Sequence, residues 1–190
     1  MAQRNGNLQG KKVAIIATDG VEAVELTGPR KALEDAGATV EVISLKSGEI
    51  QGFNHDQPGP KIKVDKEIGQ VKPDDYDNLV LPGGVANPDK LRTHPEVVSF
   101  VKSFFDSGKA VASICHGPWT VIEAGVVKGR TLTSWPSLKT DITNAGGKWV
   151  DKEVVTDQGL TTSRNPDDLP AFNKAIIEEF SHASSMAGVK

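Results

Sequence analysis

The chain contains a single cysteine, Cys115, whose sequence setting is that of a reactive thiol. The apolar run 110–114, typical of a strand buried on both faces, ends directly at this residue. Gly117 follows two residues later, and Pro118 is well suited to open a helix. This order predicts a nucleophile elbow, with Ser113 in place of the usual first glycine. Because a helix N-terminus stabilises an anion, we expect the pKa of the thiol to be lowered.

Several other residues could take part in a reaction at Cys115. His116 follows the thiol directly and is a candidate general base or thiolate partner. Glu22 lies just past the end of the first expected strand, where it is either a solvated residue or an acid reaching the thiol; Glu25 is the less favoured alternative. The segment Pro82-Gly83-Gly84 is either a tight turn or a loop with exposed N–H groups. From it we predict an oxyanion hole made by the backbone N–H groups of Gly84 and His116.

The elements that must position these residues alternate along the chain. Buried strands are expected at 13–17, 39–45, 78–81 and 110–114, and helices towards 36, over 95–105, from 118 to 124, over 136–145 and from 165 to 180. Residues 46–60 indicate a loop or loose hairpin, 61–64 an exposed strand, and 154–163 a hairpin or strand pair. The alternation predicts one α/β domain over 11–183 with a mostly parallel sheet, between flexible tails at 1–10 and 184–190. In such folds the chemistry is found at the carboxyl ends of the strands.

Charge and residue composition argue against several classes of protein. The net charge is −3, and no run of Lys or Arg exceeds Lys11-Lys12, which argues against a nucleic-acid or polybasic membrane surface. The N-terminal residues have no apolar core, and the longest apolar runs are of strand length. One cysteine cannot form an internal disulfide, and the four histidines are not at metal-ligand spacing. We therefore expect a cytoplasmic protein that needs no metal and no organic cofactor.

Four motifs together resemble the PfpI family, the intracellular-protease-like branch of the DJ-1 superfamily within the class I glutamine-amidotransferase-like group. They are Val-Glu-Ala-Val-Glu-Leu, Leu-Val-Leu-Pro-Gly-Gly, Ala-Ser-Ile-Cys-His-Gly-Pro and Ser-Arg-Asn-Pro-Asp-Asp-Leu. The resemblance extends from Lys12 to Phe180. It implies a flavodoxin-like, three-layer α/β/α sandwich. It also implies that Cys115 is the nucleophile, that Glu22 is the acid beside its sulfur, and that His116 is the histidine of a Cys-His pair.

The resemblance further implies a homo-oligomer, at least a dimer. In peptidase-like members a third acidic residue comes from a neighbouring subunit, in the stretch after Pro-Gly-Gly. The matching residue here is Asp89, where the peptidase-like pattern has Glu. Asp is shorter by one methylene, which weakens the peptidase interpretation more than it weakens chemistry at Cys115.

Three functions fit these residues. The favoured one is a stress-response enzyme that acts on small reactive carbonyls, as a glutathione-independent glyoxalase or protein deglycase. The second is an intracellular cysteine peptidase with Cys115, His116 and Asp89 as its triad. The third is a sensor of oxidants or a chaperone without turnover. All three need a reactive cysteine, so the sequence alone leaves them open.

Overall fold

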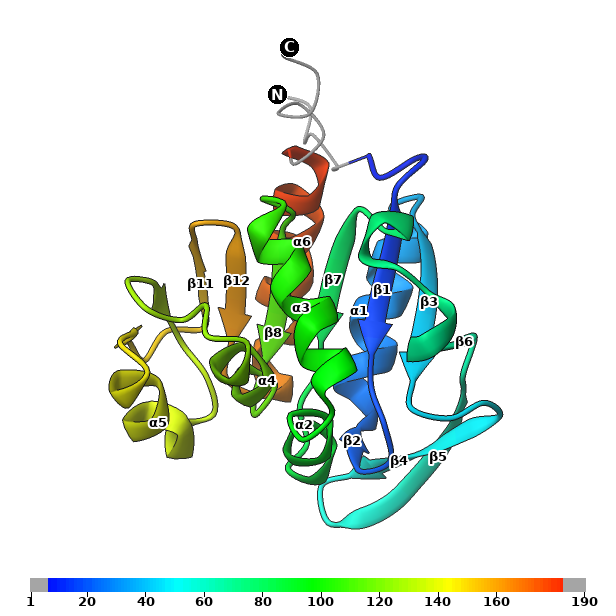
Figure 1. Cartoon of the computed structure of the whole chain (residues 1–190), viewed down its shortest axis with the longest axis horizontal. Coiled ribbons are helices and arrows are strands. Elements are labelled where there is room, and N and C mark those ends of the chain that lie inside the picture. Colours follow the sequence, from blue (N-terminus) through cyan, green and yellow to red (C-terminus); the bar gives the residue numbers. More distant parts are fainter. Residues whose placement is uncertain (1–6, 183–190) are drawn as a thin grey trace.

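The computed structural model describes residues 7–182 and shows a three-layer α/β/α sandwich (Figure 1). The strands of the central sheet are β1 (Lys12–Ile16), β3 (Thr39–Ser44), β6 (Lys66–Glu67), β7 (Asn78–Leu81), β8 (Val111–Ile114), β11 (Val154–Asp157) and β12 (Leu160–Ser163). Their order across the sheet is β11-β12-β8-β7-β1-β3-β6, and β11 is the antiparallel member. The expected mostly parallel sheet is confirmed, and β1, β7, β8 and β12 place their carboxyl ends along one edge.

Helices cover both faces of this sheet (Figure 1). One face packs against α1 (Ala23–Asp35) and α6 (Leu169–His182), which bury Leu26, Leu33 and Phe172 in a common core. The other face packs against α3 (Pro95–Asp106), α4 (Pro118–Glu123) and α5 (Lys139–Asn144). The predicted amphipathic helix over 95–105 is α3, and its apolar residues are buried in this second core. Two buried cores hold the strands between them, so the strand ends form a rigid platform for loops.

Shorter elements lie at the ends of the sheet. A three-stranded sheet is formed by β2 (Val21–Glu22), β4 (Glu49–Asn54) and β5 (Gln57–Lys63), so residues 46–63 adopt the hairpin alternative. A second pair is formed by β9 (Thr131–Leu132) and β10 (Lys148–Trp149). The remaining elements are α2 (Ala86–Leu91) and the 3₁₀ turns η1 (Ile68–Gln70), η2 (Pro73–Asp75), η3 (Pro136–Leu138) and η4 (Pro166–Asp168).

Three features of the structure were open or not predicted. The pair Gly28-Pro29 allows either two short helices or one kinked helix, and the structure shows a single helix α1, in which Pro29 lacks one backbone hydrogen bond while the helix keeps its buried face. The helix α2 was not predicted, because Asn87-Pro88 is typical of a turn; Pro88 is tolerated in the first turn, where N–H groups have no intrahelical partner. Leu8 is fully buried and its N–H donates to the carbonyl of Ala36, so the packed domain begins before residue 11. Residues 1–6 of the predicted tail 1–10, and the whole predicted tail 184–190, lie outside the described residues.

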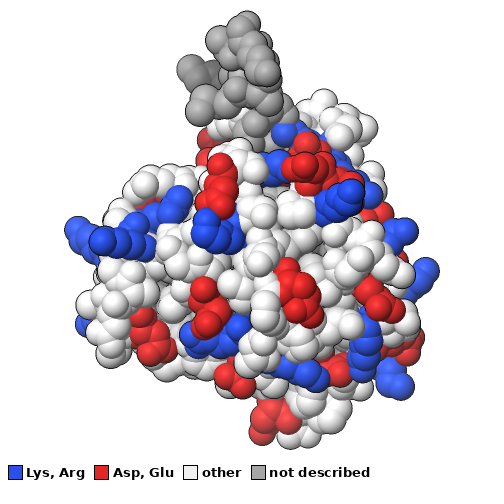
Figure 2. Space-filling model, viewed as in Figure 1, with Lys and Arg blue, Asp and Glu red and all other residues white. Residues whose placement is uncertain are grey.

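The surface carries both signs of charge. On the face seen in Figure 2, Lys and Arg are interspersed with Asp and Glu, in agreement with the absence of a basic run in the sequence. Over residues 7–182, none of the helices has the length and apolar character required to cross a membrane.

Candidate active site

Cys115 occupies a sharp turn between β8 and α4, as the elbow motif predicts. Its φ is 62°, a left-handed conformation that non-glycine residues adopt at a cost. Within residues 7–182 two other non-glycine residues share this conformation, His55 and Gln158, and both lie in hairpin turns. Backbone strain of this kind is of order 1–3 kcal/mol and persists only where the surroundings enforce it.

Glu25 is the carboxyl beside the thiol. It is fully buried on the inner face of α1, and its Oε2 accepts the N–H of Gly83 at 2.8 Å. Its other oxygen, Oε1, has no hydrogen-bond partner among the described residues, and the carboxyl interacts with the Cys115 thiol. Burial raises the pKa of Glu25 to about 8, so the group is mostly protonated at neutral pH.

The preference for Glu22 as the sulfur's partner is therefore corrected. Glu22 is the N-cap residue of α1 and pairs with β4, so its side chain leaves the helix before the inner face begins. Its carboxylate accepts the N–H of His55 at 3.0 and 3.2 Å. Glu25 lies almost one turn further along, on the face that meets the sheet.

The environment of the Cys115 thiol shifts its pKa in the direction opposite to the one that the sequence predicts. Burial raises the pKa of Cys115, and ionised Glu25 raises it further, while the N–H groups of Gly84 and His116 lower it. The exposed fraction of Cys115 is 6%, so the desolvation of a thiolate outweighs the helix N-terminus. The expectation of a lowered pKa is wrong for the thiol next to an ionised Glu25. When Glu25 keeps its proton, its repulsion is absent and its O–H can be donated to sulfur.

His116 lies against the sulfur. Its Nδ1 is 3.1 Å from Sγ of Cys115, and burial lowers the pKa of its imidazole, which favours the neutral ring. The ring packs edge-on to Trp119 at 5.1 Å and stacks on Trp135 at 5.8 Å, measured between centroids. Within residues 7–182 no hydrogen bond or ion pair joins His116 to a carboxylate. Asp89, the predicted third member of a triad, lies on the exposed side of α2.

The loop after β7 brings its backbone to the thiol. A Cβ on Gly83 would lie 2.6 Å from Oε2 of Glu25 and 2.7 Å from Cβ of Cys115, so only glycine permits this approach. Gly84 has a φ of 76°, and its N–H is directed at the sulfur, as is that of His116. The two donors predicted for the oxyanion hole therefore meet at the thiol.

Asn87 supports this loop and was not foreseen. Its fully buried side chain accepts the N–H of Thr18 at 2.8 Å and donates to the carbonyls of Pro82 and Gly83 at 3.1 and 3.0 Å. It thus joins the loops after β1 and β7. No pattern in the sequence separates this asparagine from one in an ordinary turn. Among the described residues there is no group of three His, Cys, Asp or Glu side chains arranged to bind a metal ion.

Comparison with known proteins identifies the family of this chain. The family model described as DJ-1/PfpI family matches residues 11–179. The chain belongs to the DJ-1/PfpI family. A Bacillus subtilis protein named "Putative cysteine protease YraA" is 42% identical over 167 residues, which are 88% of this chain and 96% of that protein. A deglycase of Pyrococcus abyssi is 44% identical over 88% of this chain and 98% of its own length.

Solved structures of the DJ-1/PfpI family share the fold. The structure of DJ-1beta from Drosophila melanogaster has a TM-score of 0.81 and 29% identity, covering 95% of this chain and 98% of that one. A two-domain protein from Anabaena variabilis with a DJ-1/ThiJ/PfpI-like and a ferritin-like domain has a TM-score of 0.85 and 33% identity, covering 92% of this chain and 49% of that one. The names of the relatives support a cysteine-dependent function for this chain.

Proposed function

We propose that the protein converts small reactive carbonyls, as a glutathione-independent glyoxalase or protein deglycase, with Cys115 as its nucleophile. The observation that carries this proposal is the buried pair of Cys115 and Glu25. A carboxyl whose pKa is raised to about 8 can both give and take a proton near neutral pH. Carbonyl isomerisation needs such a group beside the nucleophile, and Oε1 of Glu25 is buried without another partner in the described part of the chain. Relatives named as deglycases agree with this choice.

The proposed reaction can be followed with methylglyoxal. The sulfur of Cys115 adds to the aldehyde carbon, and the carbonyl oxygen takes a proton to give a hemithioacetal. Glu25 or His116 then moves the proton of that carbon to the neighbouring ketone carbon, and the hydroxyl proton passes to the ketone oxygen, which leaves a thioester of lactate. Water cleaves the thioester, releasing lactate and the thiol. One carbon is oxidised as its neighbour is reduced, so no external redox partner is needed. The N–H groups of Gly84 and His116 would stabilise the oxyanions.

The peptidase alternative requires a third residue that orients His116. Within the described chain the ring of His116 contacts Trp119 and Trp135 rather than a carboxylate. Asp89 could complete a triad only from a second subunit, so this alternative requires the predicted homo-oligomer. The similarity to YraA keeps it as the second candidate.

The test is incubation of the purified protein with methylglyoxal in the absence of glutathione. We expect lactate to form, Cys115→Ser to abolish it, and Glu25→Gln to lower kcat by about 100-fold, the usual contribution of a general acid–base. Glu22→Gln is the matched control, the same substitution at the acid that faces His55, and should retain most activity.

A parallel assay with fluorogenic peptides separates the alternatives. Peptide cleavage that is lost in Asp89→Asn, with no lactate formed, would favour the peptidase. Activity in neither assay would leave the sensor or chaperone and would contradict our proposal. Light scattering at micromolar concentration tests the predicted oligomer, and a monomer would remove the basis for a triad completed across an interface.

A further inference from the structure

The strained backbone of Cys115 is held by hydrogen bonds from two other segments. Its N–H donates to the carbonyl of Ser163 at 3.1 Å, and its carbonyl accepts the N–H of Trp135 at 3.0 Å. Ser163 is the last residue of β12, where the register pairs it with Ile114. These two hydrogen bonds are among the contacts that hold Cys115 at a φ of 62°. The position of the Ser163 carbonyl therefore bears directly on the position of the sulfur.

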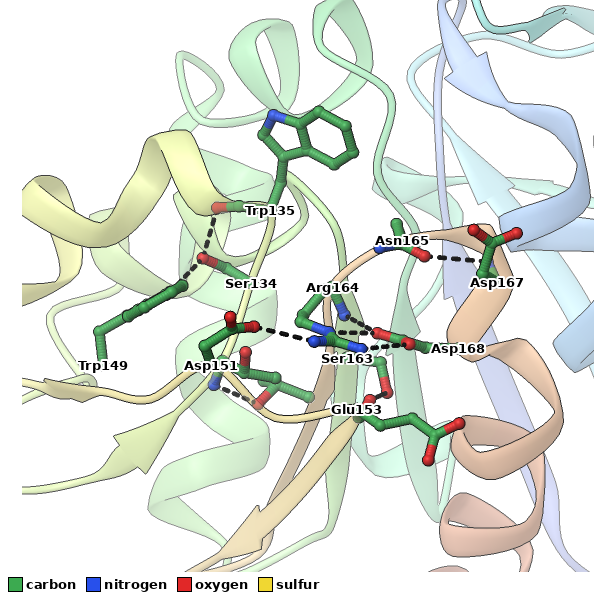
Figure 3. Close-up of polar contacts among 12 residues, drawn as sticks. Ser134, Trp135, Trp149, Asp151, Glu153, Ser163, Arg164, Asn165, Asp167 and Asp168 are labelled. Carbon is green, nitrogen blue, oxygen red and sulfur yellow. Dashed lines mark hydrogen bonds and ion pairs between the residues drawn. The ribbon is translucent and has the colours of Figure 1, made fainter.

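The residue after Ser163 is tied down by a buried carboxylate (Figure 3). Oδ2 of Asp168 accepts both the backbone N–H and Nε–H of Arg164, and Oδ1 accepts Nη2–H, each at 2.9 Å. The exposed fraction of Asp168 is 3%. A bidentate guanidinium–carboxylate pair that also binds the backbone fixes both the side chain and the chain direction at Arg164.

A second set of contacts ties the same strand end to the segment before β11 (Figure 3). Nη1 of Arg164 donates to Asp151 at 2.8 Å, and Oγ of Ser163 donates to the carbonyl of Glu153 at 2.6 Å. Capping of the following helical turn is done separately, because the side chain of Asn165 accepts the N–H of Asp167 at 3.0 Å. The bonds of Asp168 run back towards the strand end, which a mere helix cap does not require.

We propose that Arg164 and Asp168 are positioning residues for the nucleophile: their pair fixes the end of β12, and the Ser163 carbonyl there holds Cys115 in its strained conformation. Loss of the pair lets the carbonyl move, and Cys115 relaxes away from the N–H groups of Gly84 and His116. This inference rests on Cys115 being the reacting group of the proposed function. Alkylation of the thiol is measured without any substrate, so the test is independent of whether carbonyls are converted.

The experiment uses Asp168→Asn, with Arg164→Lys as a second variant that keeps the charge but loses the planar fork. We expect the rate of Cys115 alkylation by iodoacetamide to fall about tenfold in Asp168→Asn, a loss in the range that small misplacement of a reacting group produces. In the methylglyoxal assay of the same variant, kcat should fall together with the alkylation rate, while KM stays within about twofold of the wild-type value, because the pair acts through the nucleophile. Asp151→Asn leaves the pair intact and should change the rate less than Arg164→Lys does.

The matched control is Glu41→Gln, in a polar cluster away from the elbow. Glu41 is a partly buried carboxylate that accepts the hydroxyl of Tyr76 at 2.6 Å and pairs with Lys12 at 3.2 Å. This variant should lower thermal stability, followed by circular dichroism, and keep the alkylation rate. Should Asp168→Asn fail to fold, Arg164→Lys and Asp151→Asn give the graded comparison. Equal alkylation rates in wild type, Asp168→Asn and Arg164→Lys would show that the pair is structural only and overturn the proposal.

Discussion

At the scale of single residues, Cys115 and Glu25 behave as one titrating unit. Both are buried; ionised Glu25 raises the pKa of Cys115, and the hydrogen bond with the thiol lowers the pKa of Glu25. The first proton lost from the pair leaves a single negative charge that the sulfur and the carboxyl can share, and the second is lost only at much higher pH. The fraction of thiolate at neutral pH thus depends on Glu25 as much as on the helix N-terminus.

This coupling predicts a two-step pH profile for the alkylation of Cys115. The first rise should lie near pH 8, where the pair loses its first proton, and a second rise should follow at clearly higher pH. Glu25→Gln removes one titrating group, so the profile should become a single step. Measured rates of iodoacetamide labelling against pH test this, with Glu22→Gln expected to keep both steps. A single step in the wild-type protein would refute the coupling.

At the scale of elements, the site is a junction of strand ends joined by loops. Helix α2 supplies Asn87, whose three hydrogen bonds link the end of β1 to the glycine loop after β7. That loop carries both Gly83, which lets Glu25 meet the thiol, and Gly84, whose N–H is directed at it. The short helix therefore contributes to the site through the loop rather than by contact with substrate.

Replacement of Asn87 by Ala should be costly. We expect the free energy of unfolding in urea to fall by about 2–4 kcal/mol, because buried backbone groups lose their partners. The Cys115 alkylation rate should fall with the loosened loop. Asn78→Ala is a matched control: Asn78 is equally buried, but its side chain makes one hydrogen bond, to Ala110 at 3.4 Å. It should cost less and leave the thiol rate unchanged; equal effects in both variants would contradict the linking role.

The sequence predicted those parts of the site that depend on local order along the chain. The elbow at Cys115 follows from a buried strand, a glycine and a helix-opening proline, and the pattern survives folding unchanged. Glu22 and Glu25 both follow the first strand, and the contacts that separate them, Glu22 with His55 and Glu25 with Gly83, join segments that are distant in the sequence. No sequence periodicity encodes the roles of Asn87 and Asp168. Asn87 bonds to Thr18, which is distant in the sequence, and Asp168 bonds back to Arg164 at the end of β12.

At the scale of the whole molecule, a buried carboxyl makes folding sensitive to pH. The pKa of Glu25 is raised from about 4.5 in an unfolded chain to about 8 in the folded protein. The folded state therefore binds this proton more tightly, and the associated stability is complete below pH 4.5 and lost as pH rises through 8. Ionisation of this one active-site carboxyl therefore lowers the stability of the whole domain.

We therefore predict that the unfolding free energy of the wild-type protein falls relative to that of Glu25→Gln as pH rises from 4.5 to 8. Glutamine cannot titrate, so the variant should lack this part of the pH dependence. Urea unfolding followed by circular dichroism at several pH values measures both curves. Parallel curves across that range would mean that Glu25 ionises as freely in the fold as in the unfolded chain.

The three tryptophans contact His116 or the segment beside it, which affects how the protein can be observed. Trp119 and Trp135 pack on the ring of His116, and Nε1 of Trp149 donates to Ser134, the neighbour of Trp135. Intrinsic tryptophan fluorescence will therefore report on the region around His116 and Ser134 and not on the β3–β6 edge of the sheet. A fluorescence transition that precedes the circular dichroism transition would then show that this region unfolds locally before the domain unfolds globally. The same emission offers a label-free signal for occupancy beside the thiol.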